Sequence, residues 1–387
     1  MKKYLYIPLA CFIASSVCGQ TTDDGSAVSF DSLINYFQKF AHRYPLSGQL
    51  NDSTTRSSLY RTEAFNVSIS DNPIAFDTNH VVVVNPYYKD DFDDYDDNYI
   101  NYPVSYSVIY EERLVSLFRN GKFVCHSLPD LQRDLGFEAK LNTKKFKYHW
   151  IIDGKLGAIS RGRIYVWDGN AWMRLKSEFP LKAQPKLFED NDFIVFGECN
   201  GEFGGTLYFF DKRTHKTYFT ESTCTNSVLR KDAGYFVLAD LGHMMGSTQV
   251  KLIRDPTRLT EARRNEIGKP RNGASLGYAD KSKAYEVPID LYGIQIFSTF
   301  NYEDRQLYIV NLIERTFLAE IKDGEVQIVH PLFDDGLYTH NPVTTSYGKY
   351  TLINLDFYGT ARDKEVSVIL LHGNKITKMD WNEEQLR

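Results

Sequence analysis

The chain has 387 residues and a formal net charge of −5 at pH 7, with 45 lysines and arginines against 50 aspartates and glutamates. This mild acidity argues against nucleic acid as a partner, because a phosphate backbone is bound through clustered positive charge. Tyrosine and phenylalanine are abundant, at 26 and 25 residues. Aromatic and β-branched residues favour pleated sheet, so the composition predicts a β-rich body.

Residues 1–19 have the pattern of a signal peptide. Two lysines (Lys2 and Lys3) precede an apolar run over residues 4–14, and small residues follow up to Gly19. The apolar run is too short to span a bilayer, and the pattern matches a cleavage site after Gly19. We therefore expect export to the periplasm, the cell surface or the medium. Cleavage takes the net charge from −5 to −7 and leaves no apolar stretch of membrane-spanning length.

Residues 20–58 form a polar N-terminal segment that contains one predicted helix. Apolar residues recur at helical spacing from Phe30 to Ala41, and Ser29 is in place to cap the helix. We expect this amphipathic helix to pack its apolar stripe on the body. A linker rich in serine, threonine and asparagine follows over residues 47–58.

From residue 59 to residue 387 the sequence repeats a pattern of four short strands. Each unit has a short first strand, two more apolar strands and a polar edge strand, joined by turns. Units are predicted at residues 147–175, 186–221, 227–254, 285–321 and 342–379, and residues 60–128 supply one or two more.

Repeats of this length and strand content are typical of propeller blades, none of which buries its own faces alone. We therefore predict an all-β fold, a β-propeller of six or seven four-stranded blades with a short N-terminal helix. Two β-sandwich domains are the alternative. The units lack the paired signature residues of WD40 and kelch repeats, and no specific family is recognised.

Three motifs in the sequence carry no clear chemistry. Residues 273–277 match the G-x-S-x-G nucleophile elbow, but the polar residues 263–272 before them cannot form the buried strand that this elbow needs. The acidic run at residues 90–98 lacks the glycine and glutamate of a calcium loop, and a solvated loop or Ca²⁺ in another geometry remain open. The basic insertion at residues 255–284, with a short helix expected over 257–267, suits a solvated excursion or an anionic partner.

Three cysteines remain after cleavage. Cys199 and Cys224 are a candidate disulfide pair, and the sequence leaves open whether they are bridged. If they are bridged, Cys125 is left as a free thiol. A lipoprotein would instead acylate Cys11 or Cys18, but neither has the residues before it that acylation needs. The nine histidines include no zinc-ligand spacing, so neither a metal site nor a cofactor is predicted.

The candidate ligand site follows from blade geometry. In a propeller, the connections between second and third strands share one face with the links between blades, and here those connections are rich in polar and aromatic residues. We expect their side chains to converge on one mouth. The predicted ligand-binding residues are Glu198, Glu202, His243, Tyr302, Glu303, Asp304, Tyr358 and Arg362.

These features favour an exported, non-catalytic binding or assembly module that holds a glycan, a peptide or an envelope protein. The alternative is a carbohydrate-active hydrolase or lyase on the same fold. That enzyme would draw an acid and a base from Glu198, Glu202, Glu303 and Asp304, with the two carboxyl groups within about 10 Å of one another. No catalytic residue is identified beyond this set.

Overall fold

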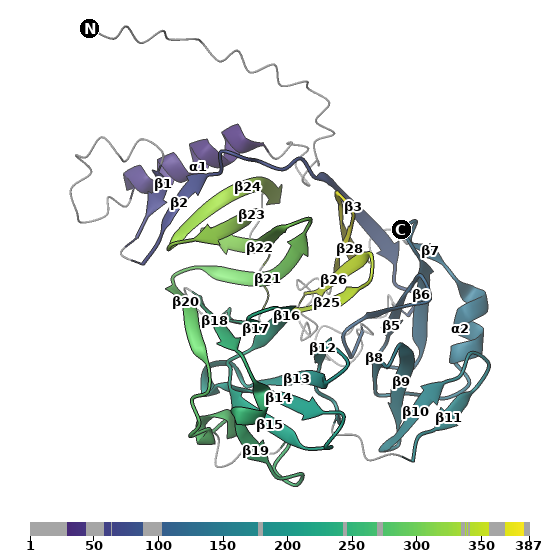
Figure 1. The fold of residues 1–387 in the computed structure, drawn as a ribbon. Coiled ribbons are helices and arrows are strands. Elements are labelled where there is room, and N and C mark those ends of the chain that lie inside the picture. Colours follow the sequence, from purple (N-terminus) through teal and green to yellow (C-terminus); the bar gives the residue numbers. More distant parts are fainter. Residues whose placement is uncertain are drawn as a thin grey trace, which may run out of the picture.

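The structure is a computed structural model in which the described residues are 29–43, 58–62, 64–87, 103–176, 181–242, 246–268, 274–333, 337, 339, 341–355 and 368–382. These residues form six sheets arranged as a ring, with two short helices (Figure 1). The prediction of an all-β propeller is confirmed, with six blades. The alternative of two sandwiches is wrong. The predicted signal peptide lies outside the described residues.

Blades 1 to 3 each begin with an innermost strand and proceed outward along the chain. Blade 1 contains β4 (Val108–Tyr110), β5 (Arg113–Leu117), β6 (Phe123–Ser127) and β7 (Gln132–Arg133), and α2 (Leu135–Leu141) follows it. Blade 2 contains β8 (Tyr148–Ile152), β9 (Lys155–Ser160), β10 (Arg163–Trp167) and β11 (Trp172–Arg174). Blade 3 contains β12 (Lys186–Glu189), β13 (Phe193–Cys199), β14 (Gly205–Asp211) and β15 (Thr217–Glu221), with β19 (Thr260–Ala262) on its outer edge.

Blades 4 to 6 follow the same order but recruit strands from elsewhere. Blade 4 contains β16 (Thr225–Lys231), β17 (Gly234–Leu241), β18 (Ser247–Ile253) and β20 (Glu286–Tyr292). Blade 5 contains β21 (Gln295–Tyr302), β22 (Arg305–Leu312), β23 (Arg315–Lys322) and β24 (Glu325–Phe333), with β2 (Asn66–Ile69) and β1 (Ser58–Arg61) beyond them. Blade 6 contains β25 (Val343–Tyr347), β26 (Tyr350–Asn354), β27 (Val368–His372), β28 (Lys375–Asn382) and β3 (Asp77–Val84).

The core consists of apolar layers between neighbouring blades. Each sheet packs both faces on other sheets, so its middle strands are apolar on both sides, as in β13, where the residues from Phe193 to Gly197 are buried. Between blades 5 and 6, Phe297 and Ile309 pack against Ile353 and Ile369. This two-sided burial explains why the sequence shows continuous apolar runs rather than clean alternation.

Residues 58–84, here called the N-terminal strap, run along the outer edges of blades 5 and 6 (Figure 1). β2 pairs with β24 and β3 pairs with β28, both in parallel. The valines at positions 81–84 therefore belong to an added edge strand and not to a blade of their own. Because the strap precedes blade 1 and lies on the last two blades, it holds the start of the ring to its end.

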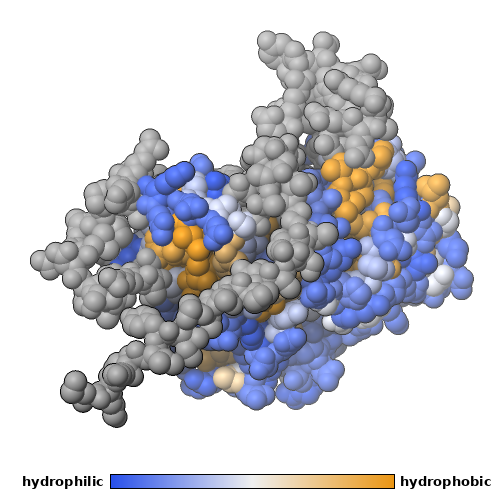
Figure 2. Space-filling model, turned by 90° about the horizontal axis from the view of Figure 1, so that it is seen from above, coloured by the Kyte–Doolittle hydropathy of each residue, from blue (hydrophilic) through white to orange (hydrophobic). Residues whose placement is uncertain are grey.

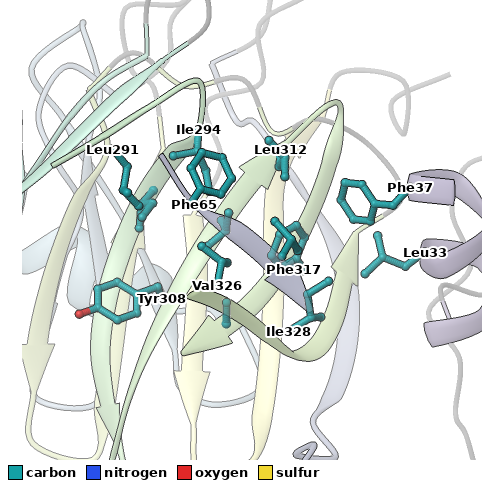
Figure 3. Packing of buried hydrophobic residues seen from close by; sticks show 14 of the residues in the cluster. Leu33, Phe37, Phe65, Leu291, Ile294, Tyr308, Leu312, Phe317, Val326 and Ile328 are labelled. Carbon is teal, nitrogen blue, oxygen red and sulfur yellow. The ribbon is translucent and has the colours of Figure 1, made fainter. Parts of the chain in front are cut away.

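The helix α1 (Phe30–Arg43) forms over the residues for which the sequence predicts an amphipathic helix. It lies on the outside of blade 5 (Figure 3). The Ser29 hydroxyl accepts a hydrogen bond from the Ser32 N–H at 3.1 Å and caps the helix. Leu33 and Phe37 are buried, and the Phe37 ring lies 6.0 Å from that of Phe317 in blade 5. The apolar stripe is thus covered by the body, as expected.

The surface is largely polar. Seen from above Figure 1, the described surface is mainly hydrophilic, and hydrophobic residues gather in a few areas between hydrophilic ones (Figure 2). Among the described residues, no helix is long and apolar enough to cross a membrane.

Candidate functional site

The antiparallel strands of each blade place its connections alternately at two faces of the ring. First-to-second turns, such as Asp153–Gly154 and Glu303–Asp304, lie at one face, here called the turn face. Second-to-third connections and blade-to-blade links, such as residues 200–204 and 222–224, lie at the other, here called the link face. A strand of seven residues separates the two faces by about 20 Å.

The structure divides the predicted ligand-binding residues between these two faces. Glu198 and Glu202 lie at the link face, beside and within the connection between β13 and β14. Tyr302, Glu303 and Asp304 form the turn between β21 and β22, which is the first-to-second turn of blade 5 and lies at the turn face. The expectation that all of them share one rim is therefore wrong.

The error comes from one strand that the sequence assigns to the wrong blade. β20 completes blade 4 as its outermost strand, although the insertion over residues 255–284 separates it from β18. The sequence reading made it the first strand of the next unit, which moved each later connection of that unit by one position. Since consecutive connections alternate between faces, a shift of one strand exchanges the two faces.

The three other predicted residues, His243, Tyr358 and Arg362, lie outside the described residues. The proposed carboxylate pairs are also affected by the division. Glu198 and Glu303 are at opposite faces, about 20 Å apart by strand length, which exceeds the separation that a glycosidase uses. Glu198 and Glu202 share the link face, and Glu303 and Asp304 share the turn face, so the distance between the faces does not separate the carboxyl groups within either pair.

Glu198 is tied into the body by both of its carboxylate oxygens. Gln184 Nε2 donates to one oxygen at 3.0 Å, and the Tyr208 hydroxyl donates to the other at 3.1 Å. Burial and the nearby Glu198 charge raise the pKa of Tyr208 well above its ordinary value, so the phenol stays protonated and remains a donor. Gln184 belongs to the link between blades 2 and 3, and Glu198 therefore joins these two blades.

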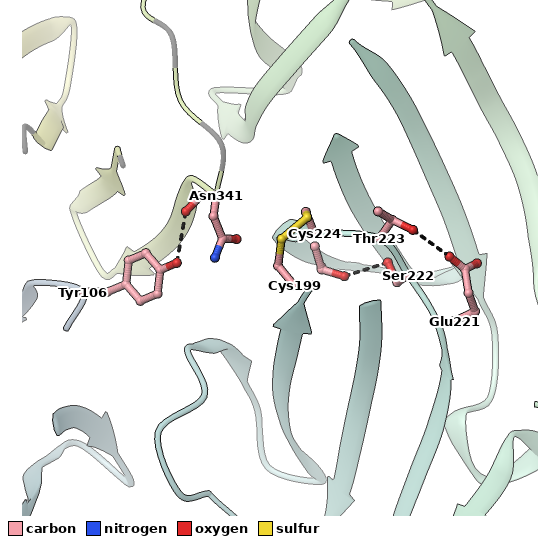
Figure 4. Close-up of a disulfide and its surroundings, with 8 residues drawn as sticks. Tyr106, Cys199, Glu221, Ser222, Thr223, Cys224 and Asn341 are labelled. Atoms are coloured by element: carbon pink, nitrogen blue, oxygen red, sulfur yellow. Dashed lines mark hydrogen bonds between the residues drawn. A yellow bond between two sulfur atoms is a disulfide. The ribbon is translucent and has the colours of Figure 1, made fainter. Parts of the chain in front are cut away.

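Cys199 and Cys224, the candidate pair in the sequence, form a disulfide at the link face (Figure 4). Cys199 ends β13, and Cys224 immediately precedes β16, the innermost strand of blade 4. The short link from β15 carries Cys224 back to the centre of the ring, so the disulfide crosses no intervening strand. Cys125 is buried as a free thiol, and burial raises its pKa well above the ordinary value.

Loss of this disulfide should destabilise the junction of blades 3 and 4. Its cysteines are 25 positions apart, and closing a loop of this length stabilises a fold by about 3 kcal/mol. We expect denaturant unfolding to show that the free energy of unfolding of the C199S/C224S variant is lower than that of the wild type by this amount. Wild-type protein in dithiothreitol should have the same stability as the double variant. Dithiothreitol should not affect the double variant. A further loss there would mean that the reductant acts elsewhere.

Ser275, the serine of the G-x-S-x-G match, has a structural role. Its hydroxyl lies 2.7 Å from the Thr206 hydroxyl and accepts a hydrogen bond from the Gly277 N–H, which starts a short 3-10 turn at Leu276–Ala279. The side chain is buried. Earlier in the insertion, Pro256–Arg258 form a 3-10 turn and Thr260–Ala262 form the edge strand β19, so the helix expected over residues 257–267 is not formed.

The central channel opens on the turn face through a cavity of 570 Å³, which is lined by the innermost strands of blades 2 to 6. Lys186 pairs with Glu189 at 2.8 Å, and Lys212 bridges Glu189 at 2.6 Å and Asp153 at 2.9 Å. Because the charges of this network offset one another, the mouth presents no dominant sign to a ligand. Within the described part of the chain, no group of three or more His, Cys, Asp or Glu residues could hold a metal ion.

A groove lies between blades 2 and 3, with a cavity of 700 Å³ at its turn-face end. Its floor is apolar and is formed by Trp150, Ile164, Val166, Ile194 and Phe210. The outermost strand of blade 2, β11, is short and has three residues. Ile164 and Val166 are half-buried, and Leu175 at the edge is 36% exposed. Asp153 and Lys212 belong to both this cavity and the channel mouth.

The groove continues to the link face as a second cavity of 680 Å³. The two cavities share Ile164 and Leu175, and together they are here called the inter-blade groove. Apolar side chains again form the floor of the second cavity, while its rim is cationic. The cationic residues, here called the basic end, are Lys147, Arg163, Arg174, Lys176, Lys182 and Arg264.

The sequence reading missed the inter-blade groove. Strands of a blade are apolar on both faces, so Ile164 and Val166, which face the groove, look the same in sequence as the buried Trp167. The available signal was the set of lysines and arginines at the strand ends of unit 147–175 and in the link after it. The uneven distribution of charge, rather than hydrophobic periodicity, marks this surface.

No model of a known protein family matches the chain, and no curated protein matches its sequence. Solved structures match in fold. The N-terminal domain of Nup159 is 11% identical over 71% of this chain and 76% of that chain, with a TM-score of 0.34. Hsv2 of Kluyveromyces lactis is 8% identical over 74% and 75%, with a TM-score of 0.34, and the designed protein Ika8 is 9% identical over 73% and 96%, with a TM-score of 0.32. This likeness concerns the fold alone.

Proposed function

We propose that this protein is an exported binding or assembly module that holds an extended segment of a peptide or protein partner in the inter-blade groove. The observation that carries the proposal is an apolar floor that stays open to solvent over cavities of 700 and 680 Å³. Ligand sites are typically concave, mainly apolar and of this size, with a few polar groups that fix orientation. The groove replaces the loop rim as the proposed binding surface.

The shape and lining of the groove favour a peptide over a glycan. The groove follows the length of β10 from the link face to the turn face, and the five residues of this strand span about 17 Å. An extended peptide of similar length matches that span. Ile164, Val166 and Leu175 offer aliphatic contacts, which suit apolar side chains better than hydroxyl groups.

Export is part of the proposal and rests on the pattern of residues 1–19. The disulfide between Cys199 and Cys224 supports it, because disulfides persist in oxidising compartments outside the cytoplasm. The buried state of Cys125 keeps the remaining thiol from exchange with that disulfide.

The proposal predicts that one substitution in the groove weakens peptide binding. Peptides of about ten residues would be selected on the mature protein from a random display library and measured by calorimetry. Leu175→Asp places a charge on the apolar edge shared by both cavities, and we expect the dissociation constant to rise at least about tenfold. Leu175 is 36% exposed, so the fold should tolerate the change.

The matched control is Val287→Asp, which alters a residue of β20 in blade 4 that is 41% exposed. This variant should bind the selected peptides as the wild type does. Equal weakening by both variants would rule out the groove as the binding surface. Selection of glycans on an array, with no peptide bound, would rule out the proposed class of partner.

A further inference from the structure

Four cations of the basic end carry positive charge that the described residues do not neutralise. Lys147, Arg163, Arg174 and Lys176 are exposed, and their side chains make no hydrogen bond or ion pair within the described residues. Lys182 donates from Nζ to the carbonyl oxygen of Ile267 at 3.0 Å, which is an uncharged acceptor. No aspartate or glutamate of the described residues lines this cavity.

Some cations elsewhere on the surface pair with carboxylates. Lys216 pairs with Glu261 at 2.8 Å, and Arg254 pairs with Glu286 at 2.9 Å. In a chain with more acidic than basic residues, carboxylates are available for such pairing. The basic end instead gathers exposed cations with no described carboxylate in its lining, and this raises the local positive potential.

The two sequence segments that flank the basic end contain more basic than acidic residues. Residues 177–180 and 269–273 flank it and lie outside the described residues. Together they contain one acidic residue, Glu178, and two basic residues, Lys269 and Arg271.

We infer that the partner segment is acidic where it meets the link face and aliphatic where it continues along the groove. This inference rests on the proposed function and adds the chemistry of the partner. The carboxylates of the segment pair with Arg163 and Arg174, whose guanidinium groups bind carboxylates through paired N–H donors. The next side chains lie on Ile164 and Leu175, which join the basic end to the apolar floor.

An acidic peptide fits this surface better than an anionic polysaccharide. A polysaccharide repeats its charge and its hydroxyl groups along the whole chain. It would bring polar groups onto the aliphatic floor, where burial without a hydrogen-bond partner is unfavourable. A peptide changes from charged to apolar within a few residues, and the groove makes the same change along its length.

The test uses the mature full-length protein and three sets of synthetic peptides of about ten residues. All sets share aliphatic residues at alternate positions and differ in the others, which are aspartate and glutamate, asparagine and glutamine, or lysine and arginine. We expect the acidic set to bind at least about tenfold more tightly than the amide set in low salt, with the difference falling as salt rises. R163E/R174E should abolish this preference, and R163K/R174K should retain most of it.

The control variant is R61E/K375E, which changes the net charge equally at exposed positions of β1 and β28. It should keep the preference for acidic peptides. If acidic and amide peptides bind equally well, the proposed function stands and the inference about charge is wrong. If no peptide set binds, the proposed function itself fails. Binding of heparin without binding of acidic peptides would replace the peptide with a polyanionic glycan.

Discussion

Replacing Asp380 by alanine should lower the free energy of unfolding by about 3–5 kcal/mol, because it removes the carboxylate from a buried ion cluster. Asp380 Oδ2 accepts a hydrogen bond from His80 Nε2 and lies 3.3 Å from Lys378 Nζ. The Lys378 and Asp380 side chains are 7% and 3% exposed. Without the carboxylate, the lysine would keep its desolvation cost and lose a negative charge that helps to offset it.

The location of the cluster determines where the loss should be seen. His80 belongs to β3 of the N-terminal strap, and Asp380 and Lys378 belong to β28, the outermost of the four blade 6 strands. Denaturant unfolding measures the total loss. Hydrogen exchange should show the largest loss of protection in residues 77–84 and 375–382, with smaller changes in β26. We therefore expect the strap to open before the blade does.

A double variant separates charge pairing from packing. K378M/D380L replaces the charged pair by apolar side chains, and such replacements are often neutral or stabilising. It should recover most of the stability that D380A loses. If the double variant is as unstable as D380A, the shape of the contact and not its charge holds the strap to blade 6.

The architecture of this protein was accessible from sequence because it depends on local patterns. The helical stripe through Leu33 and Phe37 and the repeated apolar strands depend on residues close together in the chain. The parallel attachment of β3 to β28 was not accessible. Its valines at positions 81–84 show that a strand forms but not which strand it pairs with, nearly 300 positions away in the sequence.

The candidate site was less accessible because it depends on the position of each strand within its blade. A single strand, β20, was assigned to blade 5 instead of blade 4, and Tyr302, Glu303 and Asp304 moved to the wrong face. The inter-blade groove was missed for a different reason. Whether Ile164 and Val166 are covered depends on how closely blade 3 approaches blade 2, and neither strand carries that information alone.

Replacing Asp240 by asparagine should change the pH dependence of stability by up to about 4 kcal/mol, since about 1.4 kcal/mol accompanies each pKa unit. Asp240, in β17, is fully buried. Its Oδ1 accepts hydrogen bonds from the Thr248 hydroxyl at 2.6 Å and the Ile296 N–H at 3.0 Å, while Oδ2 has no partner within the described residues. Burial raises the pKa of Asp240 to about 7, although both hydrogen bonds lower it.

The direction follows from proton linkage. The raised pKa means that the folded protein binds a proton that the unfolded chain has lost, so this group stabilises the fold below its unfolded pKa of about 4. That contribution is lost as the pH rises from about 4 to 7, where the buried carboxyl ionises. The asparagine variant cannot ionise there. Its stability relative to wild type should therefore increase from pH 4 to pH 8.

Denaturant unfolding at several pH values would measure this difference, and subtraction of the two curves removes the titration of all other groups. Asp280 gives the matched control, because hydrogen bonds from Thr260 and Ser282 lower its pKa despite the burial that raises it. For D280N the relative stability should instead fall as the pH rises through the acidic range. Parallel curves for wild type and D240N would mean that Asp240 is ionised at low pH like an exposed carboxyl. Opposite slopes for D240N and D280N would show that the availability of hydrogen-bond donors, and not burial alone, decides the charge of each carboxyl.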